Sequence, residues 1–548
     1  MSAQKTSNTS IGSGEATGDR VFLRKASGLI KTASTTDVFI FNVGLVSVGI
    51  GIGGLLLYGP AVYPGGNLIV GVLVAAVMMG LIAWGMLTWT VTIPRSGGIY
   101  PFGSRILPPS VAFTLSVVES LAWLFFCAIA AYWVVTIGLI PMFTVGAAVT
   151  GNSDLTSVAT FLSHKGITFL LGAIVLLLAG GILTSGMRRY FLTQKVVVAV
   201  ATVGTLLLFV LLLFGSRGTF VSHFNHYFGP KTTYASVIAS GKSGGWNGDH
   251  FSLGQTLKAS NWAFLPLIGA AFSIAIGGEI KSGMKGQSRG MFGAIIVCSI
   301  CFLISIVLAY HIFGYDFLGT VGYNSLGFNT SANALTTPTT PWITLLAGVL
   351  SGSWVVTVLV SLGFMAWIWM WIPGMQAYGE RAMIAWAFDR VAPAPLGRVD
   401  DRLHSPVVAI AVATVVTLIF LVLFVFTTYF ATLVVFIMIA LGAWAIVLAA
   451  GVVFPYKRPE IYEKSPISKR KVLGLPLMTV ACGCGFVGAV FYFFTLFFDD
   501  FAAGHDVGRL AIMAGCFLGG FIFFHIMKAF RKSQGVDVDL AFKQIPIE

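Results

Sequence analysis

Residues 47–54 read Ser-Val-Gly-Ile-Gly-Ile-Gly-Gly, inside an apolar segment from Val38 to Tyr58 that is long enough for one membrane helix. A glycine inside a helix costs about 1 kcal/mol relative to alanine, so four glycines within six positions predict that the helix unwinds there. Unwound backbone is tolerated in hydrocarbon only where it is buried in protein or lines a watery cavity. The stretch therefore predicts a solute-binding site at mid-membrane depth, as in transporters with interrupted helices.

The composition predicts an all-α polytopic membrane protein. Hydrophobic residues make up 57% of the chain and charged residues only 10%, whereas a soluble protein carries roughly 25% charge. Windows of about 20 apolar residues predict about twelve membrane helices. They lie near 36–59, 67–91, 110–148, 166–186, 190–215, 262–281, 290–314, 341–372, 406–427, 430–454, 473–498 and 507–530. The third is too long for one perpendicular crossing, so it is tilted or extends beyond the membrane.

The distribution of lysine and arginine predicts the orientation. All but six of the 33 lie in the two termini and in alternate loops, and such loops are typically cytoplasmic. We therefore expect both termini in the cytoplasm and a multi-pass protein of the cell membrane. The net charge of +13 then reflects topology, with attraction to anionic lipid head groups as a by-product, and no nucleic-acid partner is expected.

A second interruption follows one half-protein later. The segment 262–281 contains Pro266 and Gly269 where a helix would otherwise be continuous. The two interrupted segments begin two sets of five helices, and an odd number gives the sets opposite orientations, as in inverted-repeat transporters. The predicted organisation is a flexible tail (1–35), a first repeat (36–215), an outer loop (216–261), a second repeat (262–455), a cytoplasmic loop (456–472), two accessory helices (473–530) and a C-terminal tail (531–548).

Several stretches resemble one known family. Residues 94–109, Pro-Arg-Ser-Gly-Gly-Ile-Tyr-Pro-Phe-Gly-Ser-Arg-Ile-Leu-Pro-Pro, are similar to a loop of the permeases of the amino acid–polyamine–organocation superfamily. Residues 381–393, Arg-Ala-Met-Ile-Ala-Trp-Ala-Phe-Asp-Arg-Val-Ala-Pro, resemble its Arg-x-x-x-Ala-x-Ala-x-Asp-x-x-x-Pro segment, and 279–282 and 289–295 resemble further pieces. The likeness is collinear from about 36 to 455 and implies the LeuT-type fold.

The resemblance also implies where the substrate binds. A substrate carboxylate meets backbone N–H groups of the first interrupted helix, and an ammonium meets carbonyls and side chains around both breaks. The implied substrate-binding residues are Ser47, Val48, Gly49, Ile50, Gly51, Phe264, Leu265, Leu267 and Gly269.

Two departures from the family pattern bear on the mechanism. The family's Gly-x-Glu in the sixth helix aligns with Gly269-Ala270-Ala271 or, in another register, with 277–279, and we prefer the first because Glu279 then lies near the cytoplasm. In the fifth helix, the lysine of some proton-coupled relatives is replaced near 201–202, which leaves the coupling mechanism in doubt.

Glu119 is the acidic residue that we place well inside a predicted helix. An intramembrane carboxyl costs a few kcal/mol unless it is protonated or paired. Glu119 is therefore a coupling candidate, as a proton carrier or a counter-charge for a cationic substrate. The structural alternative is a protonated acid that is hydrogen-bonded to Ser116 or Ser120, or paired with Arg95 or Arg105.

Five charged residues are candidates for a cytoplasmic gate or, equally, for structural links between loops. Arg95 and Arg105 lie in the loop at 94–105, and Arg381 and Asp389 are expected to supply charged partners. Glu279 is expected to form an ion pair near the same face. Asn42 and Ser361 are weaker candidates, expected to form hydrogen bonds between helices.

These observations predict a secondary active transporter for an amino acid or a related organic amine, working by alternating access. Alternatives are a transporter of another organic solute on the same fold, or a channel, which would need a polar stripe through the apolar interior. We expect no enzyme, cofactor or metal site, because no His, Asp, Glu or Cys cluster is visible and no ATP-binding motif occurs. We expect transport to be coupled to protons or to proceed by exchange, as a symporter or an antiporter, with H+ or Na+ as the candidate coupling ions. Substrate identity and oligomeric state stay open.

Overall fold

The computed structural model describes residues 31–281, 283–332, 334–427, 434–502, 505–538 and 542. Most of the predicted tail at 1–35 lies outside the described residues, since the description begins at residue 31. The predicted C-terminal tail at 531–548 is described only through residue 538 and at 542.

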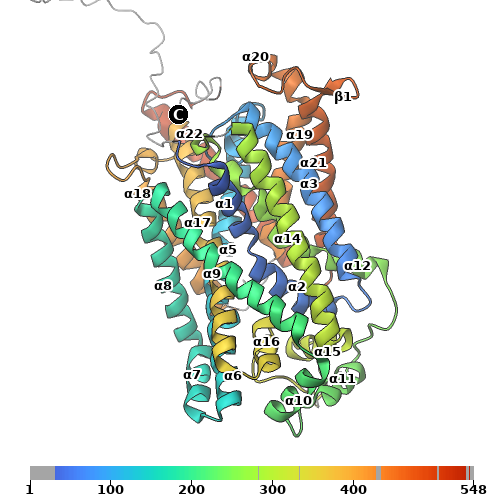
Figure 1. Cartoon of the computed structure of the whole chain (residues 1–548). Helices are drawn as coiled ribbons and strands as arrows, with labels where there is room; N and C mark the ends of the chain where they lie inside the picture. Colours follow the sequence, from blue (N-terminus) through green and yellow to red (C-terminus); the bar gives the residue numbers. More distant parts are fainter. Residues whose placement is uncertain are drawn as a thin grey trace, which may run out of the picture.

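The described chain is a bundle of helices, and its β-structure is one short hairpin of Lys471–Val472 (β1) and Leu475–Pro476 (β2) (Figure 1). The prediction of an all-α polytopic membrane fold is confirmed. Eleven helical segments are long and apolar enough to cross a membrane within the described residues. They are α1–α2 (Thr35–Val46 and Val48–Val62), α3 (Leu68–Thr92), α5–η1–α6 (Pro109–Trp133, Val134–Leu139 and Ile140–Thr150), α8 (Lys165–Thr184), α9 (Met187–Phe214), α14 (Gly283–Phe313), α17 (Trp354–Phe388), α18 (Val407–Phe426), α19 (Val434–Lys457), α21 (Leu477–Phe497) and α22 (Val507–Ser533).

The predicted helix at 262–281 accounts for the difference between about twelve and eleven. It is divided into α13 (Asn261–Leu267) and two 3₁₀ segments, η2 (Ile268–Ala275) and η3 (Gly277–Glu279), so no piece is a full-length membrane helix. The predicted helix at 341–372 is also wrong in its bounds. Its first part is a separate helix, α16 (Ile343–Ser351), which ends at Gly352 in the left-handed conformation, and α17 continues to Phe388.

Shorter elements connect the long helices. They are α4 (Tyr100–Gly103), α7 (Ser153–Ser163), α10 (Arg217–Phe228), α11 (Tyr234–Ser243), α12 (Leu253–Ala259), α15 (Tyr315–Ser325), η4 (Ala394–Gly397) and α20 (Pro459–Tyr462). The predicted loop at 216–261 is thus mostly helical. The long third helix is confirmed, because α5, the π-helical turn η1 and α6 form one segment of 42 residues.

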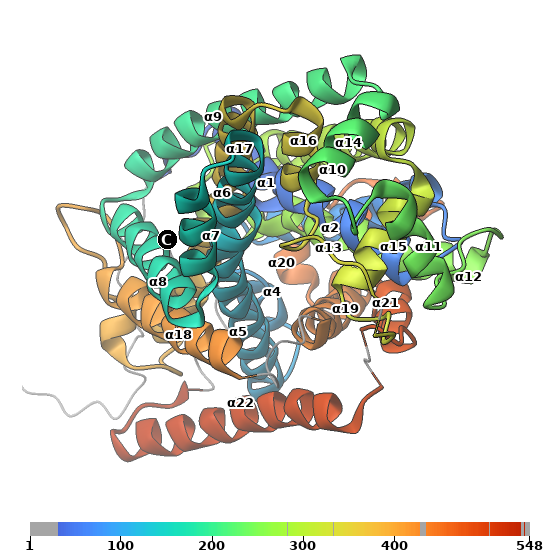
Figure 2. The same ribbon diagram turned by 90° about the horizontal axis from the view of Figure 1, so that it is seen from below.

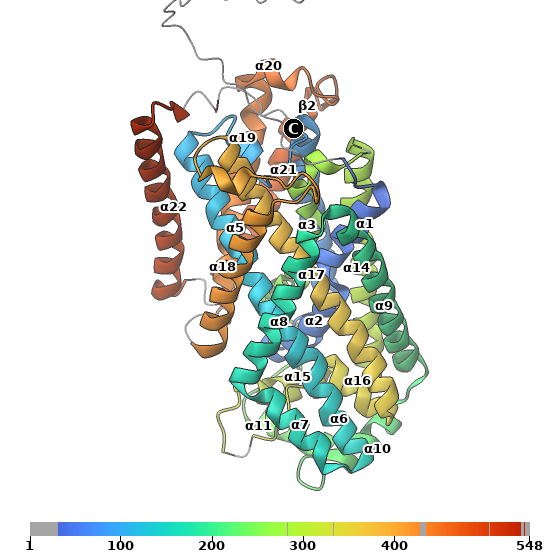
Figure 3. The same ribbon diagram turned by 90° about the vertical axis from the view of Figure 1, so that its left-hand side faces the viewer.

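The bundle has two ends, which we name by the chain. The terminal end, at the top of Figure 1, carries the start of α1, the end of α22 and the α19–α21 connection; the distal end carries α7, α10, α11 and α15. Viewed from the distal end, α1 and α2 lie inside the bundle (Figure 2). In Figure 3, α22 stands apart at the edge, where its main contact is α5.

Burial separates the central helix from the lipid-facing ones. In the most apolar part of α1–α2, 94% of residues are buried, compared with 28% for α9. Local sequence sets the ends of α1: Ser34 and Asp37 form a capping box at its start. The segment α1–α2 is therefore the core around which the other helices pack.

Candidate functional site

The first interruption is confined to one residue. Helix α1 ends at Val46 and α2 begins at Val48, and Ser47 between them has φ +52°, a left-handed conformation that side chains other than glycine seldom adopt. The Ser47 hydroxyl accepts a hydrogen bond from the N–H of Ile50 at 3.4 Å, so Ser47 caps the new helix. The break therefore lies at Ser47 and not across residues 47–54.

The prediction that the glycine run unwinds is wrong, because Gly49, Gly51, Gly53 and Gly54 lie within α2. Close packing offsets their helical cost. A Cβ at Gly51 would lie 2.1 Å from a ring carbon of another helix, a distance that no real contact reaches. The aromatic side chains that occupy this space are Trp367 beside Gly49, Phe302 beside Gly51, Trp342 beside Gly53 and Trp262 beside Gly54. Gly49, Gly51 and Gly54 thus let α17, α14 and α13 approach α2, whereas a Cβ at Gly53 would make an ordinary contact with Trp342 at 3.6 Å.

The second interruption meets the first. At Ile268 the segment changes from α-helix to 3₁₀-helix, and Gly269 lies against the end of α1. A Cβ at Gly269 would lie 2.1 Å from the carbonyl oxygen of Leu45 and 2.7 Å from the backbone nitrogen of Val46. Only glycine permits this backbone-to-backbone approach.

A buried polar network holds the two broken segments together. Asn42 on α1 donates to the hydroxyl of Ser273 at 3.0 Å, and the N–H of Ser273 donates back to the Asn42 side chain at 3.1 Å. Gln287 on α14 completes the network, as an acceptor from the Ser273 hydroxyl and a donor to its carbonyl. The predicted interhelical hydrogen bond of Asn42 is confirmed, whereas the buried hydroxyl of Ser361 has no hydrogen-bond partner among the described residues.

Tryptophans of α17 line the break. The Trp371 indole donates a hydrogen bond to the carbonyl oxygen of Leu45, in the last turn of α1. The Trp367 indole donates to the Thr205 hydroxyl on α9 at 2.8 Å, and its ring packs on Gly49. Both rings are therefore part of the interior of the bundle.

The side chains predicted to bind substrate at the second break pack in different places. Leu265 and Ile50 line one small apolar cavity of about 10 Å³, closed by Tyr58, Trp262 and Trp342; that is about the space of one water molecule. Leu267 is fully buried. Phe264 instead stacks on Tyr492 of α21 with ring centres 3.7 Å apart, so its side chain packs on an accessory helix.

Glu119 is buried on α5, but its partners differ from those predicted. One carboxylate oxygen, Oε1, accepts hydrogen bonds from the Tyr378 hydroxyl and the Trp444 indole. Oε2 has no hydrogen-bond partner within the described residues. The predicted partners are wrong: the Ser116 hydroxyl accepts from the Trp386 indole, the Ser120 hydroxyl has no hydrogen-bond partner among the described residues, and Arg105 pairs with Asp389.

Aromatic rings connect Glu119 to the second break. Phe272 of η2 lies 4.5 Å from the ring of Trp123 and 5.3 Å from that of Tyr378. Since Tyr378 donates to Glu119, the ring of Tyr378 joins this carboxyl to η2 by direct packing.

At the terminal end, charged residues close the bundle. We name Arg105, Glu279, Glu380, Arg381 and Asp389 the terminal cluster. Arg105 lies 3.4 Å from Asp389, which confirms the predicted pairing, and Arg381 binds Glu279 at 3.0 Å and also contacts Glu380. All five side chains are buried. Arg95 is half-buried at the neighbouring loop.

Backbone pairing reinforces the terminal cluster. The N–H groups of Thr32 and Ala33 both donate to the Glu279 carbonyl at 3.0 Å, and the N–H of Gly97 donates to Ala275 at 3.0 Å. The start of α1, the loop at 94–98 and the end of the second broken segment are thereby held together. Glu279 belongs to this end and Gly269 to the break, in agreement with the preferred register.

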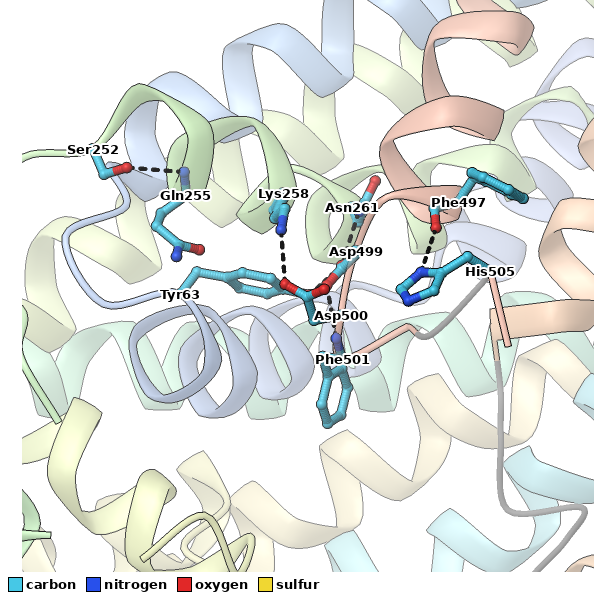
Figure 4. Close-up of polar contacts among 10 residues, drawn as sticks. All are labelled: Tyr63, Ser252, Gln255, Lys258, Asn261, Phe497, Asp499, Asp500, Phe501 and His505. Atoms are coloured by element: carbon cyan, nitrogen blue, oxygen red, sulfur yellow. Dashed lines mark hydrogen bonds and ion pairs between the residues drawn. The ribbon is translucent and has the colours of Figure 1, made fainter. Parts of the chain in front are cut away.

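At the distal end a different set of residues joins the broken helices (Figure 4). We name Tyr63, Asn261 and Asp499 the distal cluster. Tyr63, at the end of α2, donates to Asp499 at 2.5 Å, and Asn261, at the start of α13, donates to the same carboxylate oxygen at 3.3 Å. Desolvation by burial raises the pKa of Asp499 above its ordinary value despite these hydrogen bonds.

Several of these residues carry no sequence signal. Asp499 follows the end of α21 beside Asp500, and Tyr378 and Trp444 lie in apolar helices whose partners depend on the fold. Gln287 offered a weak signal, as an uncharged polar residue near the start of a membrane helix. The predicted residues form three groups: the break, the terminal cluster, and Glu119 with its partners Tyr378 and Trp444, which we name the Glu119 cluster.

The chain matches one protein-family model, described as amino acid permease, over residues 34–522. The match covers both broken segments, the Glu119 cluster, and the terminal and distal clusters. None of the curated proteins matches the sequence significantly.

Proposed function

The chain belongs to the amino acid permease family, and we propose that it is a secondary active transporter that moves an amino acid or a related organic amine by alternating access. Membership establishes a multi-pass membrane transporter of amino acids or related solutes, and not an enzyme. The observation that carries the finer proposal is the meeting of the two interrupted segments, where Gly269 packs against the last turn of α1.

The proposed carboxylate site is the start of α2. The N–H groups of Val48 and Gly49 open that helix and have no acceptor within it. The positive end of the helix dipole favours an anion at the same place. Ser47, Ile50 and Gly51 contribute by permitting the turn and the close approach.

The proposed amine site is the end of α1, where carbonyl groups lose their helical partners. Leu45 is the carbonyl nearest the second break, and the Trp371 indole is its donor in this closed arrangement. Leu265 and Gly269 form the opposing wall, Leu267 supports it from the core, and Phe264 fixes α13 to α21.

We place the terminal end at the cytoplasm, because most lysines and arginines lie in the loops of that end. The terminal cluster, with Arg95 beside it, then forms the cytoplasmic gate. Protease protection of tagged termini in sealed inside-out and right-side-out vesicles tests this orientation, and tags cleaved only in right-side-out vesicles would refute it.

Uptake into proteoliposomes tests the function. Labelled amino acids and amines are presented with proton and sodium gradients imposed separately, and with internal solute for counterflow. We expect saturable uptake of at least one amino acid or amine. Uptake of only other organic solutes would favour the alternative substrate class, and a conductance without counterflow would favour a channel.

Glu119→Gln tests the coupling role. Glutamine keeps an oxygen that can accept from Tyr378 and Trp444, so the packing is preserved while the titration is removed. We expect transport to lose its pH dependence, or the affinity for a cationic substrate to fall. The matched control is Glu460→Gln on the surface, and unchanged pH dependence and affinity in Glu119→Gln would return this residue to a structural role.

A further inference from the structure

A lateral groove lies between α3 and α14, separate from the broken helices. Its volume is about 520 Å³, and its walls come from one face of α3 between Ala76 and Val91, from Phe292 of α14, and from Leu477 at the start of α21. Arg470 lines the same groove, in the connection between α20 and β1 at the terminal end.

Small residues of α3 create the groove. Gly80 and Ala76 both line it, and a Cβ at Gly80 would meet no atom within 4 Å. The adjacent Val77 is 61% exposed, so this face of α3 opens to the surroundings of the bundle. In a membrane, those surroundings are lipid tails.

The length of the groove fits one lipid leaflet. Ala76 and Val91 are separated by about 22 Å along a helix with a rise of 1.5 Å per residue. Half of a bilayer of about 40–45 Å, with its head-group regions included, is about 20–22 Å. A groove of this length therefore runs from mid-membrane depth to the head-group region, where Arg470 lies.

The charge at the mouth is positive and available. Arg470 is exposed and has no acidic partner among the described residues, whereas the nearby Arg458 is paired with Glu460 at 2.7 Å. The connection also carries Lys464 and Lys469 with one acid, Glu463, and Lys471 begins β1. A guanidinium binds a phosphate through two parallel hydrogen bonds and is the side chain best suited to that task.

We propose that this groove binds an anionic phospholipid, with an acyl chain along α3 and its phosphate on Arg470. An acyl chain gains no hydrophobic free energy on entering the groove, because bulk lipid is equally apolar. The groove therefore contributes shape complementarity, and the contact of the phosphate with Arg470 determines the preference for an anionic lipid. Ser288 of α14 also lines the groove, and its neighbour Gln287 bonds Ser273 at the break. The bound lipid therefore touches the helix that holds the second broken segment.

Lipid retention tests the proposal without reference to transport. The full chain is reconstituted in nanodiscs with equal amounts of phosphatidylglycerol and phosphatidylcholine, re-extracted in mild detergent, and the retained lipids are quantified by mass spectrometry. We expect a several-fold excess of phosphatidylglycerol in the wild type. Arg470→Gln should reduce the ratio toward one, whereas Lys471→Gln, which removes the same charge from a residue outside the groove, should keep it.

A second pair of variants tests the tail. Gly80→Phe fills the groove and should reduce retention of both lipids, and Gly181→Phe is the control, since Gly181 on α8 also has open space around it. Soluble glycerol phosphate should not displace the retained lipid. Equal retention of both lipids by the wild type, equal effects of Arg470→Gln and Lys471→Gln, full retention in Gly80→Phe, or displacement by glycerol phosphate would each overturn the proposal.

Discussion

The two ends of the broken helices are closed by different chemistry. At the terminal end, buried arginines pair with Glu279, Glu380 and Asp389, and backbone hydrogen bonds join three segments. At the distal end, Asp499 accepts hydrogen bonds from a tyrosine and an asparagine, without an arginine partner. Removing one partner of a buried ion pair is costly, because the other charge is left buried without compensation. Hydrogen bonds to a single carboxyl instead change in strength when that carboxyl gains or loses a proton. The two ends should therefore respond differently to substitution and to pH.

The largest expected effect is from Arg381→Gln. It leaves Glu279 and Glu380 buried without a counter-charge, and removing one partner of a buried pair costs about 3–5 kcal/mol. We expect a lower unfolding temperature in detergent and faster hydrogen–deuterium exchange at 31–38 and 276–281. Exchange in the distal segments 58–66 and 255–262 should change less.

The control is Arg398→Gln, which removes the same charge from an exposed position. It should leave both ends as in the wild type. Equal loss of protection at the two ends in Arg381→Gln would show that they do not open separately.

Gly269→Ala tests the contact between the two broken segments, which lies between the terminal and distal ends. The added methyl group would overlap the Leu45 carbonyl oxygen and the Val46 nitrogen. Because these are backbone atoms, they cannot move aside as a flexible side chain would, and the segments must separate. Overpacking of this kind costs about 1–3 kcal/mol. We expect impaired transport and faster exchange at both ends, whereas Gly181→Ala should be neutral or stabilising in a thermal-shift assay. Wild-type uptake and exchange in Gly269→Ala would contradict the close approach.

Tyr63→Phe weakens the distal end alone. It removes one hydrogen bond to Asp499, and such a bond contributes about 1 kcal/mol. Exchange should rise at 58–66 and stay unchanged at 276–281. Tyr456→Phe, at an exposed tyrosine of α19, is the control. A response at the terminal end would argue against separate closures.

The smallest effect is the pH dependence of the distal end. Because burial raises the pKa of Asp499, the folded, closed end binds a proton more tightly than the exposed carboxyl does. The stabilisation is complete below the ordinary aspartate pKa and is lost as the pH rises through the raised value. Asp499→Asn cannot titrate, so exchange at 58–66 should match the wild type at low pH and become slower than the wild type as the pH rises. A constant ratio across pH would exclude this role of Asp499.

The sequence predicted the class of fold because composition and hydrophobic length determine it. It located the second break, which lies between Pro266 and Gly269, but it placed the first only approximately, because that break is Ser47 and not the glycines that follow it. It misjudged what the glycines do. Their helical cost is visible in the sequence, but the rings of Phe302 and Trp367 that pack on them come from distant helices. Glu119 could be identified from the sequence because it is a carboxyl in an apolar segment. Its partners Tyr378 and Trp444 could not, because they come from other helices whose packing depends on the fold. Asp499 was missed because an acidic residue at a helix end gives no sign of burial.

The indole of Trp371 on the Leu45 carbonyl has a consequence for selectivity. When a solute with an N–H group reaches that carbonyl, it replaces a donor already present, so the number of hydrogen bonds is conserved. A neutral donor then gains nothing from the exchange. An ammonium does gain, because a hydrogen bond from a charged donor contributes about 1.5–3 kcal/mol against about 1 kcal/mol for a neutral one. In the proposed amine site, the Trp371 indole is therefore a competitor for the Leu45 carbonyl that favours positively charged donors over neutral ones.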